Sequence, residues 1–171
     1  ALGPPDAMIT PDYCRTMAAY NAAMNRRFYA AAATLTDEAR RADRGAFFGS
    51  VHGTLSHLLW GDEGWMARLD GWPPPGASLS DSPRYVADFA ELRVRREDAD
   101  ARILRWADGL DPARLSGDLT YFSAAAEREF TKPVALLVVH VFNHQAHHRG
   151  QVHAMLTAAG ARTGDTDLPF L

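Results

Sequence analysis

The sequence predicts an all-α fold in which four long amphipathic helices pack as a four-helix bundle. Three observations support this prediction. Apolar residues recur at three- and four-residue spacing in four stretches of the 171-residue chain, residues typical of helix starts precede these stretches, and one proline-rich connection separates the second stretch from the third. Apolar residues make up 47% of the chain and charged residues 23%, which is typical of a folded globular protein and excludes a disordered one.

The first two long helices have clear boundaries in the sequence. The first is expected to begin at Thr10-Pro11-Asp12, where a capping threonine precedes a proline and an acidic residue, and to run to about Leu35. A short helical turn is expected from Thr36 towards Gly49. The second long helix should begin after the cap Ser50 and end at Asp70-Gly71, because glycine commonly terminates helices.

The second half of the chain begins with a connection, residues 72–76, whose three prolines exclude a helix. A third helix is expected from Ser82-Pro83 to about Gly109. Residues 119–122 and 127–130 are expected to form two short strands of a hairpin. Lys132-Pro133 should open the fourth long helix, which runs from Val134 to about Ala159 and ends at Gly160.

Composition excludes several classes of function. The formal net charge is −3 and Lys132 is the only lysine, with the arginines scattered along the chain, so no nucleic-acid partner is expected. No apolar run approaches the ~18–20 residues that span a bilayer, so no membrane role is expected. Cys14 is the only cysteine, which excludes an internal disulfide and a cysteine-based zinc site. We expect a cytoplasmic protein with a loose tail or cloning remnant at 1–7 and one domain at 8–171.

Seven histidines are the most informative residues, and five of them lie between positions 140 and 153. His140, His144 and His148 share one face of the fourth helix, and two imidazoles one turn apart can bind a single metal ion. The sequence lacks the HExxH pattern of metalloproteases. The second helix offers His52 or His57 as a further ligand. His57 lies near the apolar stripe, where an imidazole needs a partner, so either a metal site or hydrogen-bonded core histidines would explain the pattern.

Two segments carry a family resemblance. SVHGTLSHLLWGD at residues 50–62 and VVHVFNHQAHHRGQ at 138–151 resemble the DinB/YfiT-like superfamily, and the likeness extends over residues 8–160. It implies a bacterial protein whose helical bundle has up-down-down-up order, with a short hairpin before the last helix. It also implies a homodimer and a metal site formed by three histidines. Position by position, the implied ligands are His57, His144 and His148, which leaves His140, His147 and His153 outside the metal site.

The resemblance also implies a function. Three neutral imidazoles favour zinc, nickel or another late divalent ion and leave one coordination position open. Family members with known roles are similar to thiol-dependent S-transferases, so the leading hypothesis is transfer of a low-molecular-weight thiol to an electrophilic small-molecule substrate. The alternatives are metal-dependent hydrolysis and a non-catalytic metal-binding stress-response or interaction protein.

Four further residues are candidates for supporting roles. Asp62 and Gln151 are candidates to orient a ligand imidazole through its second ring nitrogen. Arg149 follows a ligand position directly and is a candidate to bind an anionic substrate, or else to form a salt bridge between helices. His147 pairs with Gln151 one turn away and is a candidate to contact substrate. Cys14 is expected to be a buried small residue rather than a nucleophile.

Overall fold

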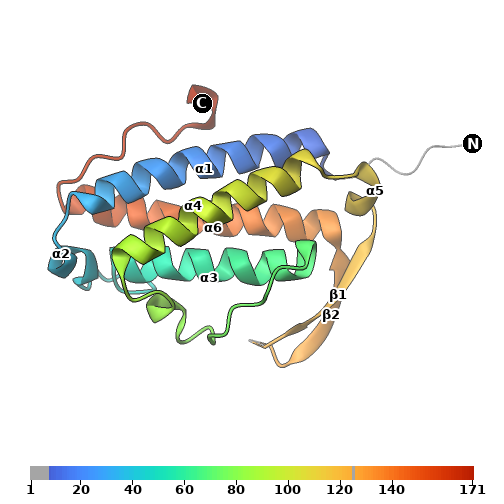
Figure 1. Ribbon diagram of the computed structural model, residues 1–171, viewed down its shortest axis with the longest axis horizontal. Helices are drawn as coiled ribbons and strands as arrows, with labels where there is room; N and C mark the ends of the chain where they lie inside the picture. The colour runs from blue at the N-terminus through green and yellow to red at the C-terminus, as the bar shows by residue number, and fades with distance from the viewer. Residues whose placement is uncertain (1–7, 125) are drawn as a thin grey trace, which may run out of the picture.

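Four long helices lie side by side in the computed structural model, which describes residues 8–124 and 126–171 (Figure 1). These helices are α1 (Pro11–Ala33), α3 (Val51–Asp70), α4 (Phe89–Asp108) and α6 (Val134–Ala158). The expected fold class is therefore confirmed. The segment expected to be a tail, residues 1–7, lies outside the described residues.

The helices follow the up-down-down-up order. Both α1 and α3 pack against α4 and α6. Figure 1 shows that α3 and α4 run in one direction and α1 and α6 in the other, because the chain between α3 and α4 returns along the length of the bundle. This crossover, residues 71–88, contains the prolines noted above and a short 3-10 turn, η1 (Ser82–Arg84). As a result, α3 and α6 are antiparallel neighbours although 63 residues of sequence separate them.

Local hydrogen bonds explain most helix boundaries. The Thr10 hydroxyl accepts from the Tyr13 amide, and the Ser50 hydroxyl accepts from the Gly53 amide. Gly71 ends α3 in the left-handed conformation, with φ of 70°. The third helix is the exception, because it begins at Phe89 and not at Ser82. Asp88 caps it, whereas Ser82 caps no helix and begins the separate turn η1.

Smaller elements lie at the two ends of the bundle and, in the C-terminal segment, beside α1 (Figure 1). Helix α2 (Asp37–Arg41) lies where a helical turn was expected, whereas α5 (Pro112–Leu115) and the turn η2 (Leu168–Phe170) were not expected. Strands β1 (Asp118–Ser123) and β2 (Arg128–Pro133) form an antiparallel hairpin in which Tyr121 pairs with Phe130. The hairpin was expected, and its strands are slightly longer than the sequence pattern indicated.

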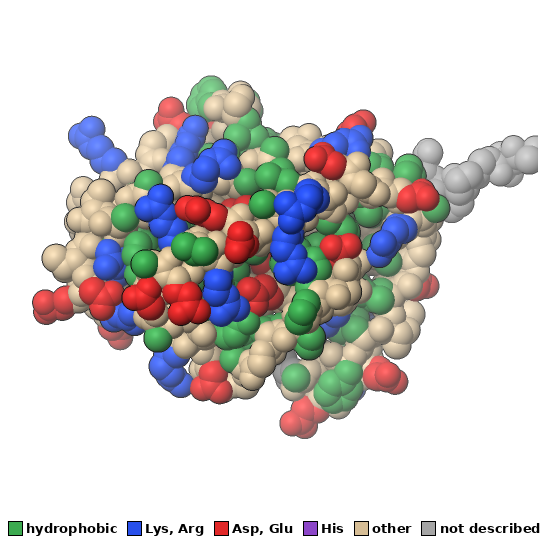
Figure 2. Space-filling view, in the orientation of Figure 1, with side chains coloured by type: hydrophobic (Ala, Val, Ile, Leu, Met, Phe, Trp, Pro, Cys, Tyr) green, Lys and Arg blue, Asp and Glu red, His purple; other side chains and the backbone are tan. Residues whose placement is uncertain are grey.

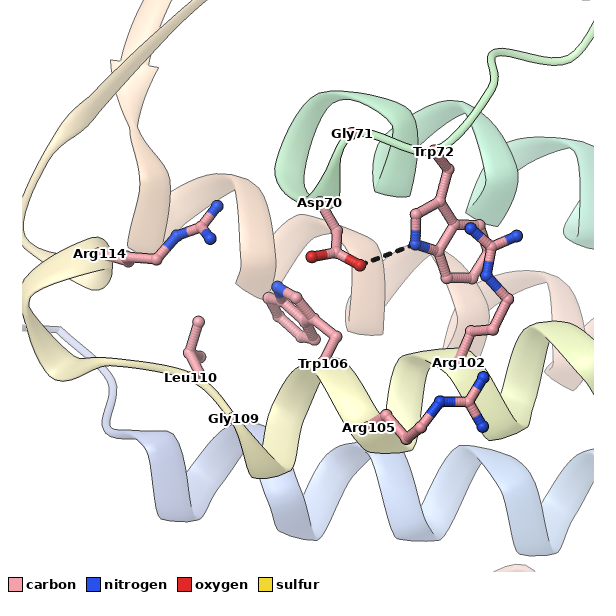
Figure 3. Close-up of a pocket in the computed structure, with 9 residues that line it drawn as sticks. All are labelled: Asp70, Gly71, Trp72, Arg102, Arg105, Trp106, Gly109, Leu110 and Arg114. Atoms are coloured by element: carbon pink, nitrogen blue, oxygen red, sulfur yellow. Dashed lines mark hydrogen bonds between the residues drawn. The ribbon is translucent and has the colours of Figure 1, made fainter.

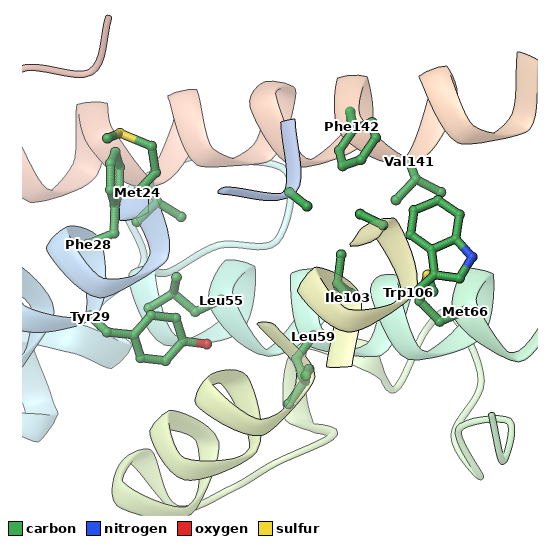
Figure 4. Packing of buried hydrophobic residues seen from close by; sticks show 14 of the residues in the cluster. Met24, Phe28, Tyr29, Leu55, Leu59, Met66, Ile103, Trp106, Val141 and Phe142 are labelled. Atoms are coloured by element: carbon green, nitrogen blue, oxygen red, sulfur yellow. The ribbon is translucent and has the colours of Figure 1, made fainter. Parts of the chain in front are cut away.

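The core contains apolar side chains from all four long helices, as Figure 4 shows. It includes Phe28 of α1, Leu59 of α3, Ile103 of α4 and Phe142 of α6, each of which is almost completely buried. Removal of this apolar surface from water is the main favourable contribution to folding.

A buried polar cluster interrupts the apolar core. We give this name to Asn25 of α1, Asp62 of α3, Arg96 and Asp100 of α4 and Gln145 of α6. Asp62 accepts from Arg96 and Gln145, while Asp100 accepts from Asn25 at 2.9 Å and lies 2.8 Å from Arg96. Burial raises the pKa of Asp62 to about 6, although Arg96 favours its charged form.

The surface carries charges of both signs. On the face shown in Figure 2, basic and acidic side chains are interspersed. Within the described residues, no helix combines the length and the apolar character that crossing a membrane requires.

Candidate metal centre

His57 of α3 and His144 and His148 of α6 come together at the contact between these two helices. One ring nitrogen from each lies within 4.8 Å of the others. Nε2 of His57 and Nε2 of His144 are 3.1 Å apart. Three histidines from two helices therefore share one small volume.

A hydrogen bond that His57 donates to the crossover defines the tautomer of its ring. Its Nδ1 lies 2.9 Å from the Ser82 hydroxyl, which donates its own proton to the Leu79 carbonyl at 2.7 Å. The hydroxyl must therefore accept from His57, so the ring proton resides on Nδ1. Ser56 holds this part of the crossover in place, because its hydroxyl donates to the Ser82 carbonyl and accepts from the Val86 amide. Nε2 of His57 is left without a proton and faces His144.

The same argument applies to His148. Its Nδ1 lies 2.8 Å from Oε1 of Gln151, and an amide oxygen can only accept, so Nδ1 carries the proton and Nε2 is free. His144 differs, because its buried Nδ1 has no hydrogen-bond partner among the described residues. With its proton on Nδ1, His144 would present a third free Nε2. With its proton on Nε2, it would donate to His57 instead.

Burial keeps these rings neutral. Burial, together with the smaller effect of charge on the neighbouring His148, lowers the pKa of His57 and of His144 to about 3. Burial also lowers the pKa of His148. Phe48 lies flat against His57 with ring centroids 3.7 Å apart, and Trp60 stacks at 5.7 Å. These aromatic rings exclude water from the imidazoles while leaving their nitrogens free.

Gly61 gives His144 the space that it occupies. A Cβ atom at this position would lie 2.9 Å from Cε1 of His144, well inside van der Waals contact. Gly61 is in the interior of α3, where its φ angle is ordinary and any residue would fit the backbone. Its role is therefore to permit the close approach of the imidazole.

The donor set fits a divalent metal ion. Two ligand nitrogens of a tetrahedral zinc ion lie about 3.3 Å apart, given Zn–N bonds of about 2.0–2.1 Å, and the 3.1 Å separation of the two Nε2 atoms is close to this value. Two proton-free imidazole nitrogens side by side repel each other unless a proton or a cation lies between them. The three-histidine group thus supports metal binding, and imidazoles suit zinc, nickel and similar ions.

Of the four residues expected to support the site, some lie beside the three histidines and others contact different helices. Gln151 contacts His148, as the expected orienting role requires. Asp62 does not contact a site histidine, because it belongs to the buried polar cluster. Arg149 is also turned away: it is 4% exposed and donates to Asn21 of α1 at 2.8 Å, and it forms no salt bridge with any described residue. His147 is exposed, and its ring is 4.8 Å from that of His148.

The remaining histidines and Cys14 lie outside this group. His140 is exposed beside His144, with ring centroids 5.9 Å apart, and His153 packs against Phe28. His52 donates to the Val86 carbonyl at 2.8 Å. Cys14 is fully buried, and burial raises the pKa of its thiol to about 11, which disfavours a nucleophilic role.

Sequence reasoning missed Ser82, Gly61, Phe48 and Trp60. Ser82-Pro83 has the residue pattern of a helix start, so its contact with His57 carried no separate signal. Gly61 lies four residues after His57, which is one helical turn, and a glycine inside a helix can indicate a close approach. This glycine one turn after His57 is the one sequence feature that could have indicated the close approach of another side chain.

A scan against protein families matches the DinB family over residues 8–171. Protein DinB from Bacillus subtilis (strain 168) is 26% identical over 170 residues, and the match covers 91% of each chain. The solved structure of YfiT from Bacillus subtilis, described as a probable metal-dependent hydrolase with an unusual four-helix bundle topology, covers 91% of this chain and 93% of its own with a TM-score of 0.63. At 14% identity this second likeness shows the fold alone. With a family match that spans nearly all of its length, the chain belongs to the DinB family.

Proposed function

We propose that this protein is a metal-dependent enzyme in which His57, His144 and His148 hold a divalent ion, zinc or nickel, and that it transfers a small thiol to an electrophilic substrate. One observation carries the proposal. Nδ1 of His57 donates to the Ser82 hydroxyl and Nδ1 of His148 donates to Oε1 of Gln151, so that Nε2 of each ring is proton-free. Such orientation of ligand imidazoles is typical of metal sites.

The chain's own residues have distinct tasks in this proposal. When bound, a divalent ion supplies positive charge that favours the anionic form of a nucleophile. Ser82 and Gln151 orient two of the rings, and Gly61 leaves room for the third. Phe48 shields His57 from water, which strengthens electrostatic interactions at the site.

Thiol transfer is favoured over hydrolysis by the composition of the site. The described residues that form it are three histidines, with no carboxylate among them. A zinc protease of the HExxH type uses a glutamate as general base, whereas a thiol, with a pKa of about 8.5, needs less help to ionise near neutral pH. Hydrolysis is the second candidate, and the fold shared with YfiT, itself described as a probable metal-dependent hydrolase, supports it.

Metal content tests the first part of the proposal. Elemental analysis should be done on protein without a polyhistidine tag, because a tag binds the same ions. We expect about one zinc or nickel ion per chain, the stoichiometry of a single mononuclear site. The ion should be lost in His57→Ala and His144→Ala and retained in His153→Ala, which removes a histidine that packs elsewhere. A folded wild-type protein that takes up no ion would overturn the proposal.

The reaction is tested on the metal-loaded protein. Conjugation of chlorodinitrobenzene in the presence of cysteine, bacillithiol or mycothiol, dependent on His57, would support thiol transfer. Cleavage of nitrophenyl acetate without added thiol would support hydrolysis instead. Metal binding without either activity would support the third alternative, a non-catalytic metal-binding protein.

A further inference from the structure

A second candidate site lies at the opposite end of α3 from the three histidines. A pocket of about 400 Å³ opens between the C-terminal ends of α3 and α4 and the short helix α5. Its volume is in the range of small-molecule sites. Asp70 in the pocket wall lies thirteen positions after His57 on α3, which corresponds to about 20 Å along the helix. The pocket is therefore separate from the candidate metal centre.

Arginine dominates the polar lining of this pocket. Arg102 and Arg105 come from α4 and Arg114 from α5, and Asp70 is the only acidic residue among the described residues of the lining (Figure 3). In the part of the chain that the structure describes, none of these three guanidinium groups lies within 4.0 Å of a carboxylate. The lining therefore has an excess of two positive charges that no described protein group neutralises.

Two of the arginines are held in place. The guanidinium of Arg102 lies over the Trp72 ring, 3.6 Å from its centroid. Arg114 donates to the Leu69 carbonyl at 2.7 Å. Asp70 accepts from the Trp72 indole at 2.8 Å, which orients the ring beneath Arg102 (Figure 3). Such a pre-arranged set of donors reduces the ordering cost of binding an anion.

A smaller apolar pocket adjoins the first. It measures about 70 Å³ and shares Trp106, Leu110 and Arg114 with the larger pocket, while Leu69, Leu119, Val134 and one further arginine, Arg68, complete its lining. Trp106 lines both pockets, although most of its surface is buried in the core. An anionic group among the arginines would thus have a small apolar space beside it.

We propose that this pocket binds a small organic dianion, a phosphate monoester or a dicarboxylate, whose charged oxygens contact Arg102 and Arg105 and whose apolar part packs against Trp106. Guanidinium groups bind carboxylates and phosphates through paired hydrogen bonds, and two negative charges balance the excess of the lining. The site does not depend on the metal centre.

Isothermal titration of the 171-residue chain at low ionic strength tests the proposal, with propyl phosphate, succinate and inorganic phosphate as probes. We expect propyl phosphate or succinate to bind with a Kd of about 1 mM or lower, and the better probe identifies the type of dianion. Arg102→Gln and Arg105→Gln should each weaken binding by about tenfold or more, because each removes a charged hydrogen bond. Arg93→Gln is the matched control, since Arg93 lies on the same helix, is exposed and pairs with Glu97.

Several outcomes would overturn the proposal. One is the absence of binding of both organic dianions at about 10 mM, a concentration well above the expected Kd. Another is equal weakening in Arg93→Gln, which would indicate only a general charge effect. Loss of binding in His57→Ala would assign the ligand to the metal centre. Equal binding of inorganic phosphate and propyl phosphate would refute the contribution of the apolar part. Arg105 is exposed, so its variant keeps the test valid even if Arg102→Gln does not fold.

Discussion

Replacing Gly61 with alanine adds one methyl group where the structure leaves no room for it. The new Cβ would lie 2.9 Å from Cε1 of His144, whereas carbon atoms in contact prefer about 3.5–4.0 Å. The imidazole must therefore retreat by about 0.6–1.1 Å. Metal–ligand distances tolerate only about 0.2 Å. We expect the zinc affinity to fall by about 10–100-fold or more, the loss typical of removing a group that orients a ligand.

In the metal-free protein, by contrast, the same substitution should raise stability. Alanine is favoured over glycine in a helix interior by about 0.8–1.0 kcal/mol, and without a metal ion the His144 ring is free to move aside. Gly64→Ala is the matched control, because Gly64 lies on the same helix and the nearest atom to its new methyl group would be Cγ of Pro75 at 3.7 Å, an ordinary contact. It should raise helix stability similarly and leave the zinc affinity unchanged.

Competition with a chromophoric chelator measures the zinc affinity of both variants, and thermal denaturation of the metal-free proteins measures their stability. A Gly61→Ala variant with the zinc affinity of the wild type would refute the reasoning, because His144 would then not need the position seen here. An equal loss in Gly64→Ala would also refute it, since the effect would then come from the helix and not from the contact.

Three further predictions concern the site and the core. Ser82→Ala removes the acceptor for Nδ1 of His57 and should weaken zinc binding about 10–100-fold in the same chelator assay; an unchanged affinity would show that the ring needs no such support. Arg96→Met leaves buried carboxylates without their partner and should lower the free energy of unfolding by about 3–5 kcal/mol in urea, whereas Arg93→Met, on the exposed face of the same helix, should change it by about 0.5 kcal/mol or less. The third prediction concerns pH. In the metal-free protein the pKa of His57 and of His144 is about 3, against about 6.5 in the unfolded chain. Below pH ~6.5 the folded state therefore binds fewer protons than the unfolded state. As the pH is lowered, the free energy of unfolding should decrease by up to about 1.4 kcal/mol per pH unit for each of these histidines. The raised pKa values of Asp62, about 6, and of Asp100, both in the buried polar cluster, oppose this trend at acidic pH. Urea denaturation at a series of pH values measures the slope, and a flat profile between pH 6 and 4 would contradict the neutral state of the rings.

Helix starts were predictable where they depend on local hydrogen bonds. Thr10 and Ser50 each accept from the amide three residues later, so the cap and its partner are close in the sequence. Ser82 has the same local pattern but a different outcome, because its hydroxyl bonds to Leu79 and to His57, which is 25 residues away. No local pattern contains that contact, and the helix was therefore expected seven residues too early.

The orientation of side chains around the helices was harder to predict. The spacing of His144 and His148 places both on one face of any helix. The choice of His57 came from the family resemblance, because α3 is buried around most of its circumference and has no clear polar face that would fix its rotation. For the same reason, the positions of Asp62 and Arg149 towards other helices could not be read from the pattern. Their partners are decided only when the four helices are aligned.

The buried polar cluster takes a member from each of the four long helices, and this constrains how the helices can assemble. Apolar contacts are not directional, so apolar stripes alone would tolerate helices that slide by one turn or exchange neighbours. A slide of α4 by one turn would move Arg96 by about 5.4 Å and leave it and Asp62 charged and unpaired in the core. The cluster therefore selects one alignment among several of similar hydrophobic energy. We expect a protein with leucine and methionine in place of the cluster to be more stable and yet to populate several helix alignments, which doubled backbone NMR resonances would reveal.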